Sequence, residues 1–276
     1  MNSVLFTKLF LGKSIEEIGA VGSRLGFDGI DLLVRTGFQV EPGKPDGIAA
    51  AVTRLKADGL TVPMATTDLT DPSAIDTERL FAAFAESGIG LVRLGYWKYD
   101  PAIGYASIFD TARAHLDELD ALARNAGITL TIQLHGDTIH ASGAQTAALL
   151  LGHDPAVIGA YIDPGNQTVQ DGREDWRFTF DVLGPWLNSV GVKNGGWFPS
   201  TLAESGQRTW HSDWLGLADG MVPWDQIIAQ LVATGFDGLL TLHSHYEVPY
   251  EQVLDQTTLD LNYIKRLIAT ESGATR

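Results

Sequence analysis

The sequence predicts a single (β/α)8 TIM barrel, an α/β fold in which parallel strands form the centre and helices lie outside. Three observations favour this fold. A short β-branched run, a turn and a helix-period segment alternate about eight times along the chain. Several runs in the second half stop at clusters of polar residues, as barrel strands do at a shared rim. No phosphate-binding glycine pattern follows the first run, where an open doubly wound sheet would usually carry one.

The predicted strands are separated by segments in which apolar residues recur at a spacing of three and four. Ser14, followed three residues later by Glu17, predicts a capping box at the start of the first helix. Several helices are expected to end at a glycine, such as Gly26. In chain order, the strands are expected at residues 4–6, 29–33, 61–65, 91–94, 128–134, 158–162, 189–192 and 238–242.

Composition and charge limit the partners. Hydrophobic residues make up 45% of the 276 residues, an ordinary globular balance, so residues 1–276 are expected to form one domain. The net charge of −15 and the lack of basic clusters argue against nucleic acid as a partner. No apolar run approaches the roughly 20 residues of a membrane span, and the first residues fit a strand better than a signal peptide. The absence of cysteine fits a reducing compartment, so a cytoplasmic location without membrane contact is expected.

The connection after the seventh strand, at about residues 193–221, is far longer than the usual βα loop of about 2–6 residues. It contains Trp197, and aromatic faces suit the apolar side of a sugar ring. Tyr96 and Trp97 follow Arg93 on the fourth strand and would add aromatic groups to the same rim. A small carbohydrate is therefore the expected partner. The alternatives are that these aromatics pack the loop onto the barrel or form an interface in a homo-oligomer.

Polar side chains follow the fifth to eighth strands, where each strand ends. The carboxyl ends of parallel barrel strands meet at one rim, so these side chains are expected to converge. They are Gln133, His135 and Asp137 after the fifth strand, Asp163 and Asn166 after the sixth, Lys193 and Asn194 after the seventh, and His243, His245 and Glu247 after the eighth.

Histidines and a lysine are the candidates for proton transfer at this rim. The ordinary pKa of histidine lies near working pH, and His243 and His245 point to the same side of one strand. His135 is a third candidate. Lysine is a base only if its pKa is depressed, so Lys193 is expected to neutralise a substrate oxyanion instead. The remaining histidines are expected in a helix or in surface-like loops: His115, His140, His153 and His211.

Two further rim residues allow more than one interpretation. Arg93 could bind a substrate carboxylate or hydroxyls, or form a core salt bridge with Asp68 or Asp31. Asn166 could bind substrate or orient Asp163. Both interpretations stay open for each residue.

The ordered motifs resemble those of the xylose-isomerase-like TIM barrels, a family of sugar phosphate isomerases and epimerases. The resemblance covers nearly the whole chain. Each motif is short, but their order and their places at the strand ends are typical of the family. The matching segments are 25–32 (LGFDGIDL), 132–137 (IQLHGD), 162–166 (IDPGN), 190–194 (VGVKN), 220–224 (GMVPW) and 235–238 (GFDG).

The resemblance also implies a metal site. In this family a divalent metal, often manganese, is held by a glutamate on the fifth strand, an aspartate on the sixth, a histidine on the seventh and a glutamate on the eighth. Here Gln133, Asp163, Gly191 and His243 stand at those positions, so the chain looks like a divergent branch with altered ligands. The implied ligands are Gln133, Asp163 and His243, for manganese first and for zinc or iron as alternatives. A metal-free polar pocket is the competing expectation.

The function that the resemblance implies is isomerisation or epimerisation of a sugar or keto-sugar by proton abstraction beside a carbonyl, with help from the metal. Glutamine cannot act as a base, so His135 and His245 are expected to transfer protons while Lys193 stabilises negative charge. One alternative is a lyase that eliminates from a keto-glycoside at the same site. Another is a non-catalytic carbohydrate-binding or partner subunit. Substrate contacts are expected from Arg93, Tyr96, Trp97, Asn166, Asn194 and Trp197.

Overall fold

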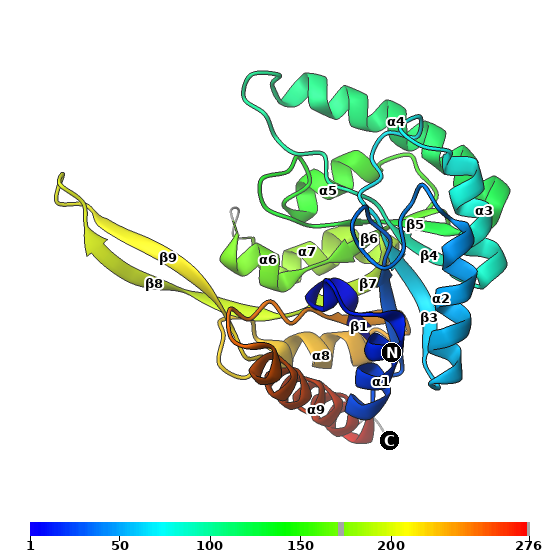
Figure 1. Cartoon of the computed structure of the whole chain (residues 1–276). Helices are drawn as coiled ribbons and strands as arrows, with labels where there is room; N and C mark the ends of the chain where they lie inside the picture. The colour runs from blue at the N-terminus through cyan, green and yellow to red at the C-terminus, as the bar shows by residue number, and fades with distance from the viewer. Residues whose placement is uncertain (171–173, 275–276) are drawn as a thin grey trace.

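The computed structural model describes residues 1–170 and 174–274, which form a closed barrel of parallel strands with helices around it (Figure 1). The strands follow the order β1-β10-β7-β6-β5-β4-β3-β2, and β2 pairs with β1 to close the ring. This confirms the predicted (β/α)8 barrel. Each predicted strand is present, and its ends differ from the prediction by two residues at most. The barrel strands are β1 (Asn2–Phe6), β2 (Gly29–Leu33), β3 (Thr61–Thr66), β4 (Leu91–Arg93), β5 (Thr129–Gln133), β6 (Ile158–Ile162), β7 (Leu187–Val192) and β10 (Leu239–Leu242).

Helical segments return the chain from each barrel strand to the next, as parallel pairing requires. Among the described residues, none of these helices combines the length and the apolar character that crossing a membrane needs. The α-helices are α1 (Ile15–Leu25), α2 (Asp46–Ala57), α3 (Thr77–Ser87), α4 (Tyr105–Ala126), α5 (Gly143–Leu150), α6 (Pro164–Val169), α7 (Trp176–Leu183), α8 (Trp224–Ala233) and α9 (Tyr250–Ala274), and the short 3-10 helices are η1 (Thr7–Phe10) and η2 (Gly184–Trp186).

The first helix begins with the predicted capping box. The Ser14 hydroxyl accepts a hydrogen bond from the Glu17 backbone N–H at 3.3 Å, and the Glu17 carboxylate accepts one from the Ser14 N–H at 2.8 Å. The two bonds satisfy backbone donors that the start of a helix leaves unpaired. The helix ends at Leu25, before Gly26.

Replacing Ser14 by alanine should lower the free energy of unfolding by about 1 kcal/mol, because the hydrogen bond from the Glu17 N–H to the Ser14 hydroxyl is lost and alanine cannot replace it. Urea denaturation followed by circular dichroism measures this change. Ser107→Ala, at an exposed position within α4, is the matched control and should change the free energy of unfolding by less than about 0.5 kcal/mol. Equal losses in the two variants would contradict the capping role.

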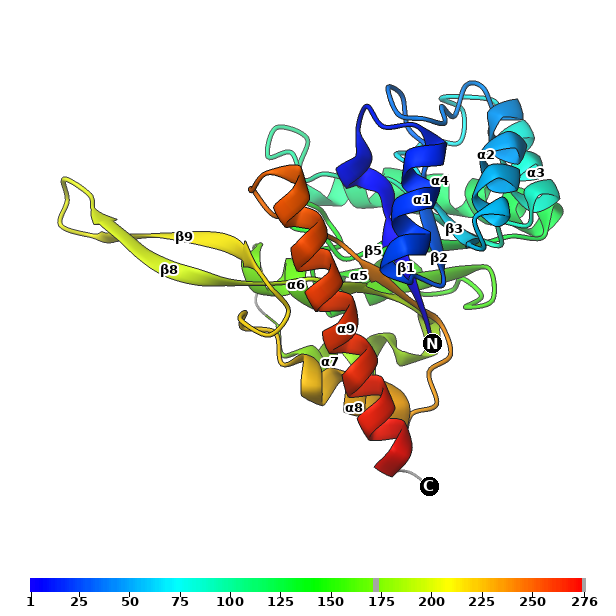
Figure 2. The same cartoon turned by 60° about the horizontal axis from the view of Figure 1, so that its bottom comes forward.

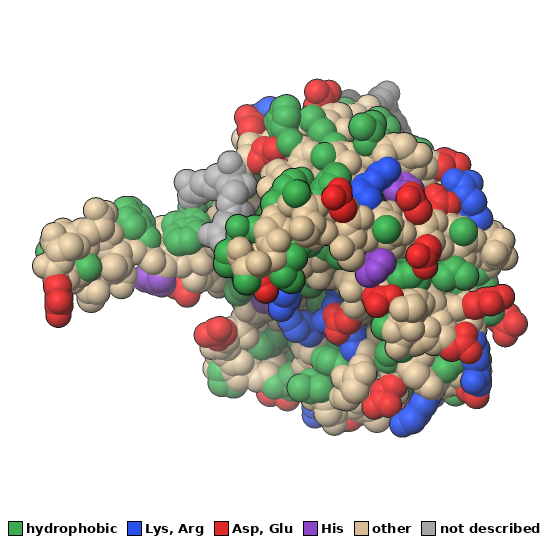
Figure 3. Space-filling view, turned by 90° about the horizontal axis from the view of Figure 1, so that it is seen from above, with side chains coloured by type: hydrophobic (Ala, Val, Ile, Leu, Met, Phe, Trp, Pro, Cys, Tyr) green, Lys and Arg blue, Asp and Glu red, His purple; other side chains and the backbone are tan. Residues whose placement is uncertain are grey.

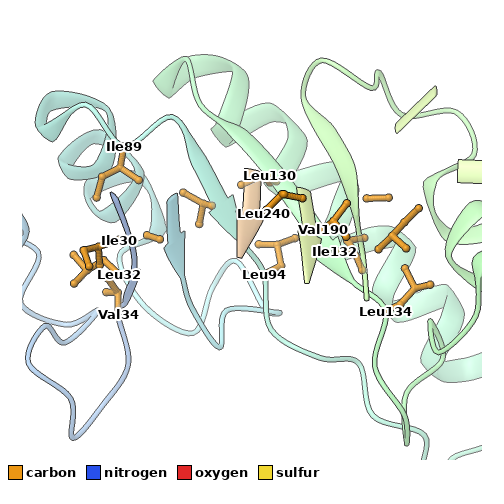
Figure 4. Packing of buried hydrophobic residues seen from close by; sticks show 14 of the residues in the cluster. Ile30, Leu32, Val34, Ile89, Leu94, Leu130, Ile132, Leu134, Val190 and Leu240 are labelled. Carbon is orange, nitrogen blue, oxygen red and sulfur yellow. The ribbon is translucent and has the colours of Figure 1, made fainter. Parts of the chain in front are cut away.

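The barrel strands divide their side chains between two environments. Alternate residues such as Leu130, Ile132, Val190 and Leu240 join the hydrophobic cluster that also includes helix residues, as the close-up of the cluster shows (Figure 4). The residues between them point the other way, into the barrel, because strand side chains alternate between faces. Many of these inner positions are polar. They include Asp31, Thr66, Arg93, Thr131, Gln133, Tyr161, Ser189, Thr241 and His243.

The long connection predicted at about residues 193–221 contains an antiparallel hairpin of β8 (Asn194–Leu202) and β9 (Arg208–Leu215). The hairpin projects from the barrel body as a two-stranded arm in both views (Figures 1 and 2). Its outer half is exposed, whereas its first residues after β7 are buried. The root of the hairpin therefore lies at the barrel rim and can contribute to a site there.

Candidate active site

Polar side chains from three neighbouring strands meet at the carboxyl end of the barrel. Gln133 ends β5, Asp163 follows β6, and Lys193 follows β7. The Asp163 Oδ2 atom accepts a hydrogen bond from Gln133 Nε2 at 2.6 Å and lies 3.1 Å from Lys193 Nζ. Side-chain exposure is 0% for Asp163 and 5% for Lys193, so this Asp163–Lys193 ion pair is shielded from solvent. The structure thus places three of the predicted site residues in direct contact.

The start of α6 fixes the Asp163 carboxylate. Its Oδ1 atom accepts a hydrogen bond from the Asn166 backbone N–H at 2.8 Å, which caps the helix. The Asn166 side chain is used elsewhere, because its Nδ2 donates to the Leu134 carbonyl at 2.8 Å. Asn166 therefore contacts Asp163 through its backbone, and its side chain links α6 to the end of β5.

Arg93 is buried at the end of β4 and holds the Gln133 amide. Its Nη1 donates to Gln133 Oε1 at 2.6 Å and also to the Tyr96 hydroxyl. The Tyr96 hydroxyl donates to the same Gln133 Oε1 at 2.7 Å. The amide is thus oriented by donors on its oxygen and by Asp163 on its nitrogen. Arg93 and Tyr96 are therefore linked to the ion pair through Gln133.

The predicted alternative of a core salt bridge from Arg93 to Asp68 or Asp31 is wrong. Asp68 pairs instead with Arg35, whose Nε lies 2.9 Å from Asp68 Oδ1. Asp31 is fully buried on the inner face of β2, and its two oxygens have no hydrogen bond of standard geometry among the described residues. Burial is the main cause that raises the pKa of Asp31 to about 6, opposed by the nearby Thr66 hydroxyl and by the Arg93 and Arg35 charges.

The Asp31→Asn variant should be more stable than the wild type at neutral pH, by an amount on the order of 3 kcal/mol. The folded-state pKa of about 6 lies above the ordinary value of 3.8, so the ionised carboxylate destabilises the fold. This penalty is absent below about pH 4 and grows to its full size as the pH rises through about 6. Urea denaturation at both ends of this range measures the effect. A difference between the variant and the wild type that does not change with pH would contradict it.

Tyr161, His243 and His245 form a hydrogen-bonded chain from the barrel interior to its mouth. The Tyr161 hydroxyl lies 2.6 Å from His243 Nε2, and His243 Nδ1 lies 3.2 Å from His245 Nε2. His243 is buried and stacks on Phe6 at a centroid distance of 4.3 Å. His245 lines a pocket of ≈ 200 Å³ together with Lys8. Either ring nitrogen can carry the proton, so this chain can pass a proton in either direction.

His135 lies on the other side of the Asp163–Lys193 ion pair. It follows β5 and His245 follows β10, and the strand order places β6 and β7, which carry the ion pair, between them. The His135 Nδ1 atom lies 2.8 Å from the Gly136 carbonyl, so Nδ1 carries the proton and Nε2 keeps its lone pair. The ring packs on Tyr96 at a centroid distance of 4.3 Å. A substrate above the ion pair would have a histidine on either side.

Burial keeps these imidazoles neutral. It is the main cause that lowers the pKa of His135. It also holds the pKa values of His243 and His245 well below their usual range, and the Lys193 ammonium adds to the effect on both. A neutral imidazole has a lone pair that can accept a proton. His135 and His245 are therefore in the protonation state that a base requires at neutral pH.

The root of the hairpin adds aromatic contacts to this rim. Lys193 Nζ lies 4.8 Å from the centroid of the Trp214 ring, a cation–π contact. The same ring lies 5.6 Å from that of His245. Trp197 faces α6, where its Nε1 donates to the Thr168 carbonyl at 2.7 Å. Trp214 of the long connection therefore reaches the ion pair, whereas Trp197 holds the hairpin onto α6.

Asn194 holds the base of the hairpin. Its Nδ2 donates to the Leu217 and Val222 carbonyls, and its Oδ1 accepts from the Gly195 and Val222 N–H groups. Every hydrogen-bonding atom of this side-chain amide therefore has a backbone partner. The structure places Asn194 as a support of the rim rather than at its mouth.

The expectation of surface-like loops for His140 and His153 is wrong, because both side chains are buried. His140 Nδ1 lies 3.0 Å from the Gln133 carbonyl, and its Nε2 accepts the Trp97 backbone N–H at 3.3 Å. Burial lowers the pKa of His140 to about 3. Trp97 is itself buried. His140 and Trp97 therefore support the end of β5 from behind, and both side chains lie under the rim.

Sequence reasoning missed Tyr161, which stands in an apolar run. Its position two residues before Asp163 was a usable signal, because alternate strand residues share a face. It also missed Gln170, whose amide nitrogen lies 3.3 Å from His135 Nε2. Gln170 follows the end of α6, and no strand pattern could have placed it at the rim.

The predicted metal ligands Gln133, Asp163 and His243 do not fit a divalent ion in this arrangement. Among the described residues, no group of three or more His, Cys, Asp and Glu side chains could hold a metal ion. The Gln133 oxygen and both Asp163 oxygens accept bonds from protein groups, and both His243 nitrogens have protein partners. The Arg93 and Lys193 charges would also repel a further cation.

The family model of the xylose isomerase-like TIM barrel matches residues 20–266 of the chain. Among solved structures, a xylose isomerase-like TIM barrel protein from Mycobacterium smegmatis in complex with magnesium is 19% identical, with a TM-score of 0.71 over 98% of this chain and 97% of that chain. An L-ribulose 3-epimerase is 16% identical, with a TM-score of 0.72 over 99% of this chain and 96% of that chain.

A third similar structure is a 3-keto-D-glucoside 4-epimerase from E. coli, which is 14% identical, with a TM-score of 0.68 over 96% of this chain and 99% of that chain. At such low identity the likeness to these structures shows the fold alone. No protein with a curated description matches the sequence.

Proposed function

Because the chain belongs to the xylose isomerase-like TIM barrel family, we propose that it is an isomerase or epimerase of a sugar or keto-sugar. The barrels of similar structure include an L-ribulose 3-epimerase and a 3-keto-D-glucoside 4-epimerase, which supports this reaction class. The observation that carries the proposal is the pair of neutral histidines on either side of a buried cation. Such a pair can take a proton from one face of a carbon and return it on the other.

His135 and His245 are the proposed bases. In the reaction, one neutral imidazole removes the proton from the carbon beside the carbonyl and becomes an imidazolium, which can return this proton to the resulting enediolate. His245 is backed by His243 and Tyr161, so a proton taken up at the mouth can be shared along that chain. Return of this proton to the neighbouring carbon gives isomerisation. For epimerisation, the other histidine takes a proton from solvent and delivers it to the opposite face of the same carbon, while the first imidazolium gives its proton to solvent.

Lys193 is the proposed stabiliser of the enediolate. Its ammonium has three protons, and Asp163 takes one of them, so the others remain for a substrate oxygen. A fixed cation in a water-poor site lowers the energy of an oxyanion more than it would in water. Tyr96, which is half-buried beside Gln133, is assigned to a substrate hydroxyl, and the buried Arg93 holds Tyr96 and Gln133 in place.

Incorporation of solvent deuterium tests this function. The protein is incubated in D2O with a panel of keto-sugars that includes L-ribulose, D-fructose and a 3-keto-D-glucoside, and NMR follows each C–H signal. The proposal predicts loss of the signal beside the carbonyl of at least one sugar, with the carbon skeleton retained. Release of an aglycone would identify a lyase instead. No exchange with any member of the panel would contradict the proposal.

Histidine variants test the assignment of the bases. His135→Gln and His245→Gln should each slow deuterium exchange by about 100-fold or more, because glutamine cannot accept the proton. His211→Gln is the matched control, since His211 lies exposed on β9 and pairs with Asp213. Its exchange rate should equal that of the wild type. A normal rate in both rim variants would contradict the assignment.

A further inference from the structure

The Asp163–Lys193 ion pair occupies the position where the family resemblance expects a metal. We propose that the Lys193 ammonium is the resident cation of this barrel and that its contacts exclude a divalent ion from the Asp163 carboxylate. The catalytic use of this cation rests on the proposed function. The exclusion of the metal rests on the contacts alone and can be measured without a substrate.

The charge and the lone pairs of Asp163 are already engaged by protein groups. Its Oδ2 accepts from Gln133 Nε2 at 2.6 Å and faces Lys193 Nζ at 3.1 Å, and its Oδ1 accepts from the Asn166 N–H at 2.8 Å. The single negative charge is matched by a single positive charge at contact distance. A divalent ion would have to displace a buried ammonium that has no second carboxylate partner among the described residues.

Gln133 is held in one orientation by its hydrogen bonds. Its amide nitrogen donates to Asp163, so its oxygen points away from that carboxylate and toward Arg93 and Tyr96. Rotating the amide by half a turn would aim its N–H groups at the Arg93 guanidinium, which also only donates. Hydrogen bonds at both the oxygen and the nitrogen of the Gln133 amide therefore fix its orientation. Gln133 and Asp163 do not present their oxygens to a common point as two metal ligands would.

Two glycines, Gly165 and Gly191, make space for the ion pair. A Cβ atom at Gly165 would lie 2.4 Å from Lys193 Cγ, so only glycine lets the lysine side chain pass. A Cβ atom at Gly191 would lie 2.6 Å from Asp163 Oδ2, so no larger residue fits beside the carboxylate in this position. Gly191 stands where the resemblance expects a histidine ligand. Lys193, two residues later, faces the same side of the chain and reaches Asp163 instead.

The surroundings of the ion pair carry further positive charge. The Trp214 ring covers the ammonium at 4.8 Å, and Arg93 lies behind Gln133. In the space-filling view from above, Lys and Arg side chains lie in a hollow beside the root of the hairpin (Figure 3). A divalent ion in this region would meet fixed positive charges and one neutralised carboxylate. Lys193 and Arg93 thus supply the positive charge that a metal would bring. Gly191 stands where a ligand to the metal would be expected.

Binding of Mn²⁺ alone tests the inference. Electron paramagnetic resonance of free Mn²⁺ titrated with metal-stripped wild type should show no stoichiometric binding. The Lys193→Met and Gln133→Glu/Lys193→Met variants remove the ammonium, and the second adds a carboxylate. They should bind Mn²⁺ at least about tenfold more tightly than the wild type. Lys56→Met, an exposed lysine in α2, is the matched control and should behave as the wild type.

Two results would overturn the inference. One is binding of one Mn²⁺ per wild-type chain that Asp163→Asn abolishes. The other is failure of both folded Lys193 variants to gain affinity, with folding checked by thermal unfolding. The proposed function fails separately. A wild type that binds no Mn²⁺ and exchanges no sugar proton would contradict the proposed function and leave the inference standing. Exchange that starts only after Mn²⁺ is added would contradict the inference and leave the proposed function standing.

Discussion

Replacing Lys193 by methionine should lower kcat for solvent deuterium exchange by about 100- to 1,000-fold, the usual loss when one preorganised donor to an oxyanion is removed. Methionine has nearly the same length and shape, so the packing against Gly165 and Trp214 should change little. The effect should fall on kcat more than on KM, because the negative charge develops only as the enediolate forms. The rate is measured by NMR on the keto-sugar that exchanges fastest with the wild type.

The matched control for this variant is again Lys56→Met, which removes a lysine far from the rim and should leave kcat within about twofold of the wild type. Thermal unfolding should show that both variants are folded. A folded Lys193→Met protein that keeps kcat within about threefold of the wild type would contradict the stabilising role of the ammonium.

Replacing Asp163 by asparagine should lower the free energy of unfolding by about 3–5 kcal/mol, because it leaves the Lys193 ammonium buried without a counter-charge. Asparagine keeps an oxygen for the Asn166 N–H, so the cap of α6 is largely preserved and the charge is the main change. Urea denaturation at neutral pH measures the loss.

The double variant Asp163→Asn/Lys193→Met isolates the ion pair. It removes both charges, so it should recover much of the stability that the single Asp163→Asn variant loses. A thermodynamic cycle over the four proteins gives the coupling free energy of the pair. Additive losses in the double variant would show that the two charges do not depend on each other, against the geometry described above.

The fold was predictable from the sequence because its signals are local and repeated. Strand runs with alternate apolar residues, and the capping box at Ser14, depend on neighbours within a few positions. The rim was predictable for the same reason. Gln133, Asp163 and Lys193 each stand at the end of a strand, and parallel strands place those ends together.

Other parts of the site depend on contacts that no local pattern encodes. His140 becomes buried because its loop folds back under β5, where its ring meets the Gln133 carbonyl. Arg93 takes the Gln133 amide rather than a carboxylate because Asp68 is held by Arg35. The side-chain nitrogen of Asn194 donates to backbone carbonyls 23 and 28 residues later in the chain. Such partners follow from tertiary packing and not from residue type or spacing.

This barrel is proposed to move a proton beside a sugar carbonyl with a lysine as its cation. The most direct measurement is deuterium exchange into keto-sugars by the metal-stripped wild type, compared with the same protein after Mn²⁺ is added. We predict that exchange occurs without metal, that Mn²⁺ changes its rate by less than about twofold, and that Lys193→Met abolishes most of it. Exchange that is absent from the stripped protein and appears only with Mn²⁺ would contradict the claim.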